Sequence, residues 1–242
     1  MVPILKLDKL TRYFAGLAAV KDVSFKLESG GLVGLIGPNG AGKTTLLSLV
    51  GGSLPPTSGK IEFEGHDLTG AKSFQAVRAG IARTHQIPKP FLTLTVLENV
   101  EVGLRFGRSG KAASSAKSAV KYLELVGIAH LVAMQASALS VGDLKRLELA
   151  RALAARPSLL LCDEVCSGLT ETETASILRL LCEIRGAGTT ILYVEHNLRA
   201  IMSVCNPVIV MNYGQKLIEG PPETVQNDSS VIEAYIGKKA AS

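Results

Sequence analysis

The sequence predicts an α/β fold with a mixed central sheet, and three features of its 242 residues support this prediction. Short apolar runs typical of buried parallel strands recur at residues 32–36, 159–162, 191–194 and 208–211. Helical patterns alternate with these runs, most clearly over residues 171–185, where Gly186 is expected to end the helix. The composition agrees, since 24 glycines, no tryptophan and 5% aromatic residues favour an aliphatic core with many turns. We therefore expect a largely parallel sheet with crossover helices.

An antiparallel β layer is expected near the beginning of the chain. Residues 4–7, 20–27 and 60–64 alternate apolar and polar side chains and are separated by turns. Such alternation is typical of antiparallel strands that bury one face.

A helical insert is expected between residues 88 and 140, where the apolar periodicity is helical only. Helices are predicted at residues 97–104 and 119–126. The stretch 107–118, which is rich in Gly, Ser, Ala and Lys, is expected to be a solvated loop between them.

The composition excludes a disordered or fibrous chain, because 47% hydrophobic residues can fill a core and only 19% are charged. No apolar run approaches the ~18 residues that cross a bilayer, so no membrane span is expected. Lys6, Asp8 and Lys9 would interrupt the apolar part of a signal peptide, and a cytosolic protein is therefore expected. The net charge of +5 suits phosphate ligands or an anionic membrane face without requiring nucleic acid.

The cysteines and most of the histidines are expected to be structural. The four cysteines have no paired CxxC spacing, which fits reduced thiols rather than a metal site: Cys162, Cys166, Cys182 and Cys205. Three histidines lack a surrounding ligand pattern and are expected to be packing or surface residues: His66, His85 and His130.

A glycine-rich segment lies between the apolar run 32–36 and a helical pattern at residues 45–50. It matches the phosphate-binding pattern GxxxxGK[ST] and consists of Gly37, Pro38, Asn39, Gly40, Ala41, Gly42, Lys43 and Thr44. The glycines allow successive backbone N–H groups to face phosphate oxygens, and the helix N-terminus adds partial positive charge. Lys43 is expected to reach the β- and γ-phosphates and Thr44 to ligate Mg²⁺, while Thr45 completes the predicted ATP-binding segment.

Two carboxylates follow the apolar run 159–162. Asp163 and Glu164 stand at the expected carboxyl end of a strand, where successive side chains diverge. We expect Asp163 to hold Mg²⁺ and Glu164 to polarise an attacking water, which favours hydrolysis of a γ-phosphate. The alternative is a pair of N-capping acids at a strand exit, which fits less well beside a phosphate loop.

A segment upstream of these acids resembles the LSGGQ signature of ATP-binding cassette (ABC) proteins. It reads Leu139-Ser140-Val141-Gly142-Asp143 and precedes a predicted helix at residues 147–155. The resemblance extends along the chain, because Gln86 resembles the Q-loop glutamine and His196 the switch histidine. The D-loop of the family is matched by Ser167, Gly168, Leu169 and Thr170. Five motifs in the expected order identify the chain as a member of the ABC family.

The ABC resemblance implies a P-loop NTPase cassette with a mixed central sheet, an antiparallel β layer and a helical subdomain. It implies catalytic roles for Glu164, Gln86 and His196, with His196 contacting the γ-phosphate. The metal ligands implied for Mg²⁺, partly through water, are Thr44, Gln86 and Asp163. Two cassettes would sandwich two ATP molecules, so the signature residues Ser140, Val141, Gly142 and Asp143 would contact ATP held by the other chain.

The adenine contact is also implied by the resemblance. Phe14 lies upstream of Gly37 where ABC proteins carry an aromatic residue that stacks on the base, and Val20 is expected to line the base. Tyr13 is the alternative stacking residue, and a core position is the alternative role for whichever ring faces inward.

Four segments resemble the ATPases of branched-chain amino-acid importers and their urea or amide relatives: residues 14–20, 83–86, 146–151 and 231–237. This resemblance implies an ATP-hydrolysing subunit that powers such an importer. The implied partners are a second ABC ATPase subunit, transmembrane permease subunits and, indirectly, a solute-binding protein, with no nucleic acid. The implied location is cytoplasmic, at the inner face of the plasma membrane.

Within a single ABC ATPase domain, 1–242, the resemblance distinguishes two parts. The nucleotide-binding core is expected at residues 1–87 and 158–242. The helical subdomain, which carries the signature, is expected at residues 88–157.

Four residues depart from the usual family pattern and are expected to affect the dimer interface: Val141, Asp143, Val165 and Thr170. Asp143 stands three residues after Ser140, and Glu173 three residues after Thr170, so both helix-capping pairs are expected to survive. The lost Asp or Asn at Thr170 leads to the hypothesis of slower hydrolysis or an asymmetric pair of sites.

Two other functions stay open from the sequence. One is a soluble ABC ATPase without a permease, for example in iron–sulfur assembly. The other is a slow or degenerate ATP-binding subunit in an asymmetric dimer.

Overall fold

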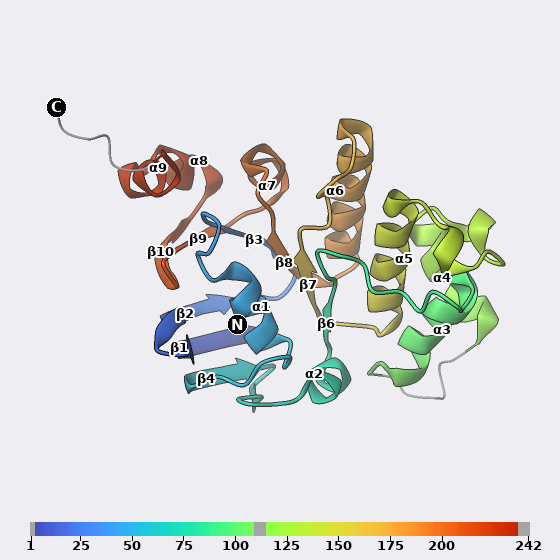
Figure 1. Ribbon diagram of the computed structural model, residues 1–242, viewed down its shortest axis with the longest axis horizontal. Coiled ribbons are helices and arrows are strands. Elements are labelled where there is room, and N and C mark those ends of the chain that lie inside the picture. Colours follow the sequence, from blue (N-terminus) through green and yellow to red (C-terminus); the bar gives the residue numbers. More distant parts are fainter. Residues whose placement is uncertain (1–2, 109–114, 237–242) are drawn as a thin grey trace.

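The larger of two β-sheets runs through the middle of the computed structural model, which describes residues 3–108 and 115–236 (Figure 1). Its order is β10-β9-β3-β8-β7-β6. The strands are β3 (Leu32–Ile36), β6 (Ile81–Arg83), β7 (Leu159–Asp163), β8 (Thr190–Val194), β9 (Val208–Asn212) and β10 (Gln215–Gly220). Only the pairing of β10 with β9 is antiparallel among these described strands. The prediction of a mixed, largely parallel sheet is therefore confirmed.

The smaller sheet is antiparallel and has the order β2-β1-β4-β5. Its strands are β1 (Leu5–Phe14), β2 (Leu17–Leu27), β4 (Ser58–Phe63) and β5 (His66–Asp67). The predicted antiparallel layer is confirmed, but β1 continues to Phe14, well beyond the expected end at residue 7. Polar residues in its second half weaken the apolar alternation that the prediction used.

Helices lie on both faces of the larger sheet and at one end of it (Figure 1). They are α1 (Lys43–Val50), α2 (Ser73–Ala79), α3 (Val96–Phe106), α4 (Ala116–Leu125), α5 (Val141–Ala154), α6 (Glu171–Gly186), α7 (Leu198–Val204), α8 (Pro222–Asn227) and α9 (Ser229–Ile236). Short 3₁₀ turns occupy Ala129–Leu131 and Ala136–Ala138. The helices expected at residues 97–104, 119–126 and 171–185 are confirmed, with α6 including Gly186. Residues 109–114 of the expected loop lie outside the described residues.

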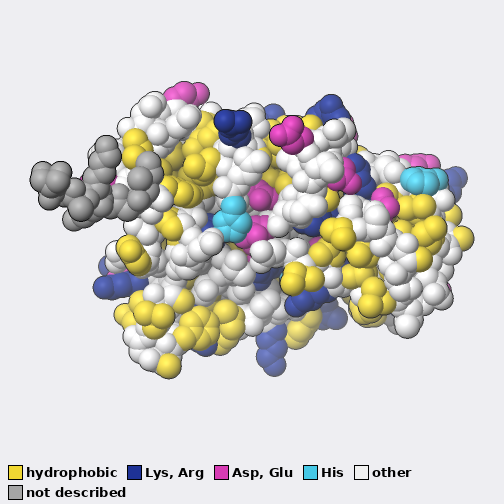
Figure 2. All heavy atoms as spheres, turned by 45° about the horizontal axis from the view of Figure 1, so that its top comes forward, with side chains coloured by type: hydrophobic (Ala, Val, Ile, Leu, Met, Phe, Trp, Pro, Cys, Tyr) yellow, Lys and Arg dark blue, Asp and Glu magenta, His cyan; other side chains and the backbone are white. Residues whose placement is uncertain are grey.

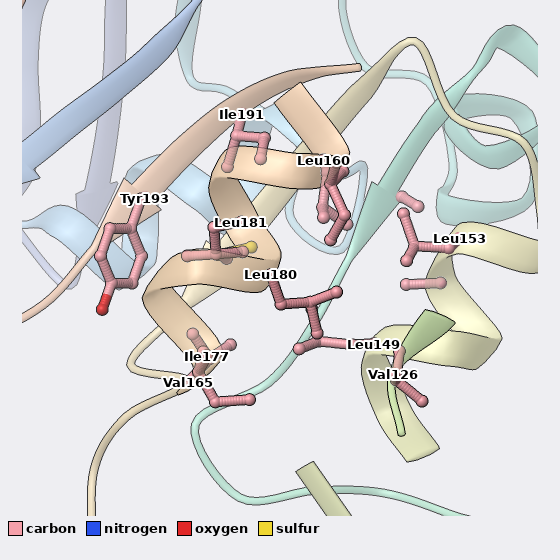
Figure 3. Close-up of a cluster of buried hydrophobic side chains, with 14 of the residues drawn as sticks. Val126, Leu149, Leu153, Leu160, Val165, Ile177, Leu180, Leu181, Ile191 and Tyr193 are labelled. Carbon is pink, nitrogen blue, oxygen red and sulfur yellow. The ribbon is translucent and has the colours of Figure 1, made fainter. Parts of the chain in front are cut away.

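Alternate residues of the central strands pack into two separate cores. On β7, Leu159 and Leu161 join the core with the smaller sheet and α1, whereas Leu160 and Cys162 join the core with α5 and α6. Figure 3 shows part of the second core, where side chains of α5 and α6 meet those of β7 and β8. Because a strand alternates its side chains, burial on both faces produces the continuous apolar runs of the sequence.

Charged side chains of both signs are dispersed over the face shown in Figure 2, with apolar side chains between them. Among the described residues, no helix is both long and apolar enough to cross a membrane. The four cysteines are free thiols.

Candidate active site

The predicted catalytic segments follow four strands that are neighbours in the larger sheet. The phosphate loop follows β3, His196 follows β8, Asp163 ends β7 with Glu164 directly after it, and Gln86 follows β6. Parallel strands align their carboxyl ends along one edge, so the fold brings together residues that are far apart in sequence. A pocket of about 460 Å³ lies at this edge and is lined by the phosphate loop, Gln86, Glu164 and His196.

The phosphate loop depends on close backbone packing at two glycines. Gly42 has a φ of 98°, and a Cβ placed there would lie 2.3 Å from the Ala19 carbonyl oxygen. A Cβ on Gly37 would lie 2.1 Å from the Met211 carbonyl oxygen. Neither position accommodates a side chain, because both contacts are with backbone rather than with a flexible side chain. The loop is therefore fixed against β2 and β9, with the N-terminus of α1 behind it.

Lys43 is folded against its own loop. Its Nζ donates hydrogen bonds to the Gly37 carbonyl at 2.6 Å and the Pro38 carbonyl at 2.9 Å. Burial lowers the pKa of Lys43, and the charges of Glu164 and Asp163 oppose this shift. The ammonium group is thus a partly desolvated positive charge at the edge of the pocket, which favours the binding of an anion.

Glu164 is held at both carboxylate oxygens. Gln86 Nε2 donates to Oε2 at 2.5 Å, and His196 Nε2 lies 2.5 Å from Oε1. The side chain is 6% exposed and lines the pocket. The structure thereby brings together the three residues predicted to be catalytic, and two of them fix the orientation of the third. A carboxylate in such a position can accept a proton from a nearby water.

Asp163 pairs with a residue that the sequence analysis did not assign to the site. Arg83 Nη2 lies 2.8 Å from Asp163 Oδ2, and Arg83 Nη1 donates to Ser48 Oγ at 2.8 Å. The other oxygen, Oδ1, is buried without a hydrogen-bond partner among the described residues. A buried carboxylate oxygen without a partner is a suitable ligand for a hard cation.

Glu195 is a second group that the sequence analysis missed. It lies immediately before His196, is 3% exposed and accepts a hydrogen bond from the Cys166 backbone N–H at 2.7 Å. Burial raises its pKa. A carboxylate next to the switch histidine was the only signal in the sequence, and nothing in the spacing indicated that its side chain would point inward.

The signature segment lies at the N-terminus of α5. Ser140 is the N-cap, and its Oγ accepts from the Asp143 backbone N–H at 3.2 Å while donating to Asp143 Oδ2 at 2.6 Å. The predicted capping pair is confirmed. Val141 is 57% exposed, and none of the signature residues lines the phosphate pocket of the same chain.

The D-loop segment ends in a confirmed capping box. The Thr170 hydroxyl and backbone N–H both donate to Glu173 Oε2, at 2.7 and 2.8 Å, and the Glu173 N–H donates back to the Thr170 hydroxyl. Ser167, Gly168 and Leu169 precede this cap. These hydrogen bonds lower the pKa of Glu173.

One departure from the family pattern is not at a surface. Val165 is 2% exposed and packs in the core with α5 and α6, so the expectation that it affects a dimer interface directly was wrong (Figure 3). The Val165 side chain points into the core, where an apolar residue is favoured.

Of the residues expected around the base, the two aromatic residues are exposed and Val20 is buried. Phe14 and Tyr13 are 41% and 42% exposed, and the Arg12 guanidinium lies 4.8 Å from the centre of the Phe14 ring. Val20 is completely buried in the core beneath the smaller sheet, so the prediction that it lines the base was wrong. Its neighbour Ala19 lines the pocket instead, because successive residues of a strand point to opposite faces.

His85 joins two elements of the site's surroundings. It lies between the exposed surface and the buried Glu148 of α5, with His85 Nδ1 3.1 Å from Glu148 Oε1. The structural role expected for this histidine is therefore a contact with a buried carboxylate of α5, next to Gln86 in the chain.

Comparison with known proteins places these motifs in one family. Residues 20–167 match the family model of the ABC transporter. The chain is 37% identical to the high-affinity branched-chain amino acid transport ATP-binding protein LivG of Salmonella typhimurium, with 98% of each chain covered. It is 34% identical to the corresponding protein BraF of Pseudomonas aeruginosa, again over 98% of each.

Solved structures agree with the sequence relatives. The nucleotide-free ATP-binding cassette of an ABC transporter superposes with a TM-score of 0.89 and 30% identity, covering 98% of this chain and 100% of that one. A cassette in its ADP conformation gives a TM-score of 0.87 and 31% identity over the same shares. The motifs, the fold and these relatives agree, and the chain belongs to the ABC transporter family of ATP-binding proteins.

Proposed function

We propose that this chain is the ATP-hydrolysing subunit of an importer for branched-chain amino acids or a related small polar solute. The observation that carries the hydrolytic part is that Gln86 and His196 each contact one carboxylate oxygen of Glu164 beside the phosphate loop. The transport part is supported by the relatives named LivG and BraF, which match along 98% of the chain.

The residues divide the reaction between them. The phosphate loop and Lys43 bind the triphosphate, and Phe14 or Tyr13 stacks on the base. Glu164 orients and polarises the attacking water, while Gln86 and His196 hold its carboxylate and contact the γ-phosphate. Positioning and electrostatic stabilisation supply most of the rate in phosphoryl transfer, and this arrangement suits both.

Mg²⁺ is the metal that the site fits. Asp163 Oδ1 is buried and unpartnered among the described residues, and Thr44 and Gln86 line the phosphate pocket. Asp163, the Thr44 hydroxyl and Gln86 would supply the oxygen ligands that Mg²⁺ prefers. When bound, Mg²⁺ would neutralise charge that develops on the phosphates. The acids Asp163 and Glu164 would otherwise repel the triphosphate, so the metal and Lys43 together make its binding favourable.

The site is proposed to be complete only in a dimer. The signature residues lie outside the pocket of their own chain, with Val141 exposed, and this supports their contact with ATP bound by a second subunit. A solved relative with 26% identity is a dimer bound to ADP and phosphate. Residues 88–157 are proposed to move as a helical subdomain against permease subunits at the inner face of the membrane, and a solute-binding protein would deliver the solute.

Phosphate release by the purified full chain tests the hydrolytic proposal. Wild type should release phosphate from ATP in the presence of Mg²⁺, and Lys43→Ala should not. Glu164→Gln should bind ATP, accumulate as a dimer in size-exclusion chromatography and lose at least about 100-fold in turnover. Robust turnover by Glu164→Gln would contradict the role of Glu164.

Uptake of radiolabelled leucine, isoleucine and valine tests the transport proposal. A strain that lacks this gene should lose uptake, and wild type but not Glu164→Gln should restore it. Unchanged uptake of all three in the deleted strain would contradict the proposed solute class while leaving the ATPase assignment intact.

A further inference from the structure

Lys145 connects the signature helix to the backbone of the catalytic glutamate. It lies on α5, little more than one helical turn after the N-cap Ser140, and is 4% exposed. Its Nζ donates a hydrogen bond to the Glu164 backbone carbonyl at 3.1 Å, and both atoms are buried. The Lys145 side chain therefore links α5 to the backbone just after β7.

Lys145 is a buried ammonium group with carboxylates near it. Burial lowers its pKa, and the negative charges of Glu195, Glu148 and Glu164 oppose this shift in part. A buried ammonium group is costly unless hydrogen bonds and opposite charges compensate it. An apolar side chain would fill the same space without the free-energy penalty of burying a charge, so packing alone does not explain a lysine at this position.

The acceptor of the Lys145 hydrogen bond, the Glu164 backbone, has an unusual conformation. Glu164 has a φ of 50°, in the left-handed region that non-glycine residues rarely adopt. Three hydrogen bonds hold this conformation: the Glu164 N–H donates to the Val194 carbonyl at 2.9 Å, and the Glu164 carbonyl accepts from the Ser167 backbone N–H at 3.1 Å and from Lys145 Nζ at 3.1 Å. Of these donors, Lys145 is the one that lies on the signature helix. A strained conformation of this kind persists only where its surroundings fix it.

The signature residues lie at the N-terminus of α5, the same helix that carries Lys145. Ser140 caps α5, and a Cβ on Gly142 would lie 2.9 Å from Glu173 Oε1 at the start of α6. The signature is thus packed closely against the segment that follows the D-loop. A shift of the N-terminus of α5 would move Lys145 with it, because the intervening residues form one hydrogen-bonded turn.

We propose that Lys145 is a positioning residue that couples the signature helix to Glu164. Contact of Ser140 with ATP on a second copy of the chain would fix the start of α5, and Lys145 would then fix the backbone of Glu164 in the first copy's own site. The inference rests on the proposed ATPase function. It adds a specific link between the two composite sites of a dimer, through a side chain that touches neither nucleotide.

The variants Lys145→Met, Lys145→Arg and Lys121→Met test the link in the full chain. Lys145→Met keeps the aliphatic stem but removes the donor, and kcat for ATP should fall about 100-fold through misplacement of Glu164. KM for ATP should stay within about threefold of wild type, because no nucleotide contact is lost. Lys145→Arg keeps a donor and should recover part of kcat. Lys121→Met, at an exposed position of α4, should behave as wild type.

Size-exclusion chromatography with ATP gives a readout that a merely structural role would not move. Lys145→Met should accumulate an ATP-bound dimer as Glu164→Gln does, since binding is intact while hydrolysis is slow. Wild-type kcat in Lys145→Met, or a rise in KM that accounts for the loss of kcat/KM, would overturn the inference. Should Lys145→Met fail to fold in a thermal melt, Lys145→Leu, which also lacks a donor, takes its place with the same expected split between kcat and KM.

The controls separate this inference from the proposed function. Absence of ATP hydrolysis in both wild type and Lys121→Met would refute the function itself. Hydrolysis at equal rates in wild type and Lys145→Met would refute the positioning role alone.

Discussion

Arg83 and Asp163 form a partly buried ion pair across neighbouring strands, with Arg83 Nη2 2.8 Å from Asp163 Oδ2. The pair occupies one oxygen of the carboxylate and leaves Oδ1 without a partner among the described residues. Asp163 is 2% exposed, so Arg83 supplies a positive charge beside a carboxylate that is largely removed from water. Arg83 therefore orients one oxygen of Asp163 and leaves the other available to a cation.

Replacement of Arg83 by Met should destabilise the nucleotide-free protein. Removal of one partner of a buried pair leaves an uncompensated charge, and we expect the free energy of unfolding to fall by about 3 kcal/mol. Urea denaturation measures this loss. Mg²⁺ with ATP should recover part of it, because a bound cation would replace the lost positive charge beside Asp163.

Arg185→Met is the matched control, since Arg185 is exposed in the last turn of α6. Its free energy of unfolding should change by less than about 0.5 kcal/mol. Equal losses in the two variants would mean that the Arg83–Asp163 pair contributes no more than a surface arginine does.

Replacement of Phe14 by Ala should weaken ATP binding. Stacking of a base on an aromatic ring contributes about 1 to 3 kcal/mol, so KM for ATP should rise about tenfold or more while kcat stays unchanged. The Arg12 guanidinium over the Phe14 ring holds the ring in an exposed position. Tyr13→Ala is the control, and a rise in KM there without one in Phe14→Ala would assign stacking to Tyr13.

The sequence was sufficient for the features that depend on local periodicity and fixed spacing. The apolar runs became β3, β7, β8 and β9, and the phosphate pattern predicted the loop because its glycines and Lys43 are neighbours in the chain. The two capping pairs were predictable for the same reason, since a cap and its partner are three residues apart.

Contacts between distant segments could not be predicted in this way. Arg83 reaches Asp163 and Lys145 reaches Glu164 only because β6, β7 and α5 meet in space. Val20 was misplaced because the sequence identifies a strand but not which of its faces is turned inward. The short helices α2, α7 and α8 were missed because six or seven residues give little helical periodicity.

Replacement of Thr170 by Asp should raise the rate of ATP hydrolysis if the loss of an acid at this position slows the enzyme. Asp is as good an N-cap as Thr, so the capping of α6 should survive and the free energy of unfolding should change by less than about 0.5 kcal/mol. Thr170→Ala is the control, because it removes the cap without adding charge. An unchanged rate of phosphate release in Thr170→Asp would refute the hypothesis of slowed hydrolysis.

Replacement of Glu195 by Gln should change how stability depends on pH. Burial raises the pKa of Glu195 above its ordinary value of 4.5, so the folded protein retains this proton at pH values where the unfolded chain has released it. Between the two pKa values the folded state binds more protons, and its free energy of unfolding falls as pH rises. The amide introduced by Glu195→Gln cannot ionise, so the variant lacks this loss.

Wild type should therefore lose stability relative to Glu195→Gln as the pH is raised from 4.5, until the folded-state pKa is passed. Urea denaturation of both proteins across this range measures the difference, with Glu183→Gln, an exposed position on α6, as the control for loss of one carboxylate. The amide oxygen introduced by Glu195→Gln can still accept the hydrogen bond from the Cys166 backbone N–H, so the comparison isolates ionisation of the carboxyl group from loss of that contact. If the free energy of unfolding of wild type instead rose relative to that of Glu195→Gln with rising pH, Lys145 would stabilise the ionised carboxylate more than burial disfavours it.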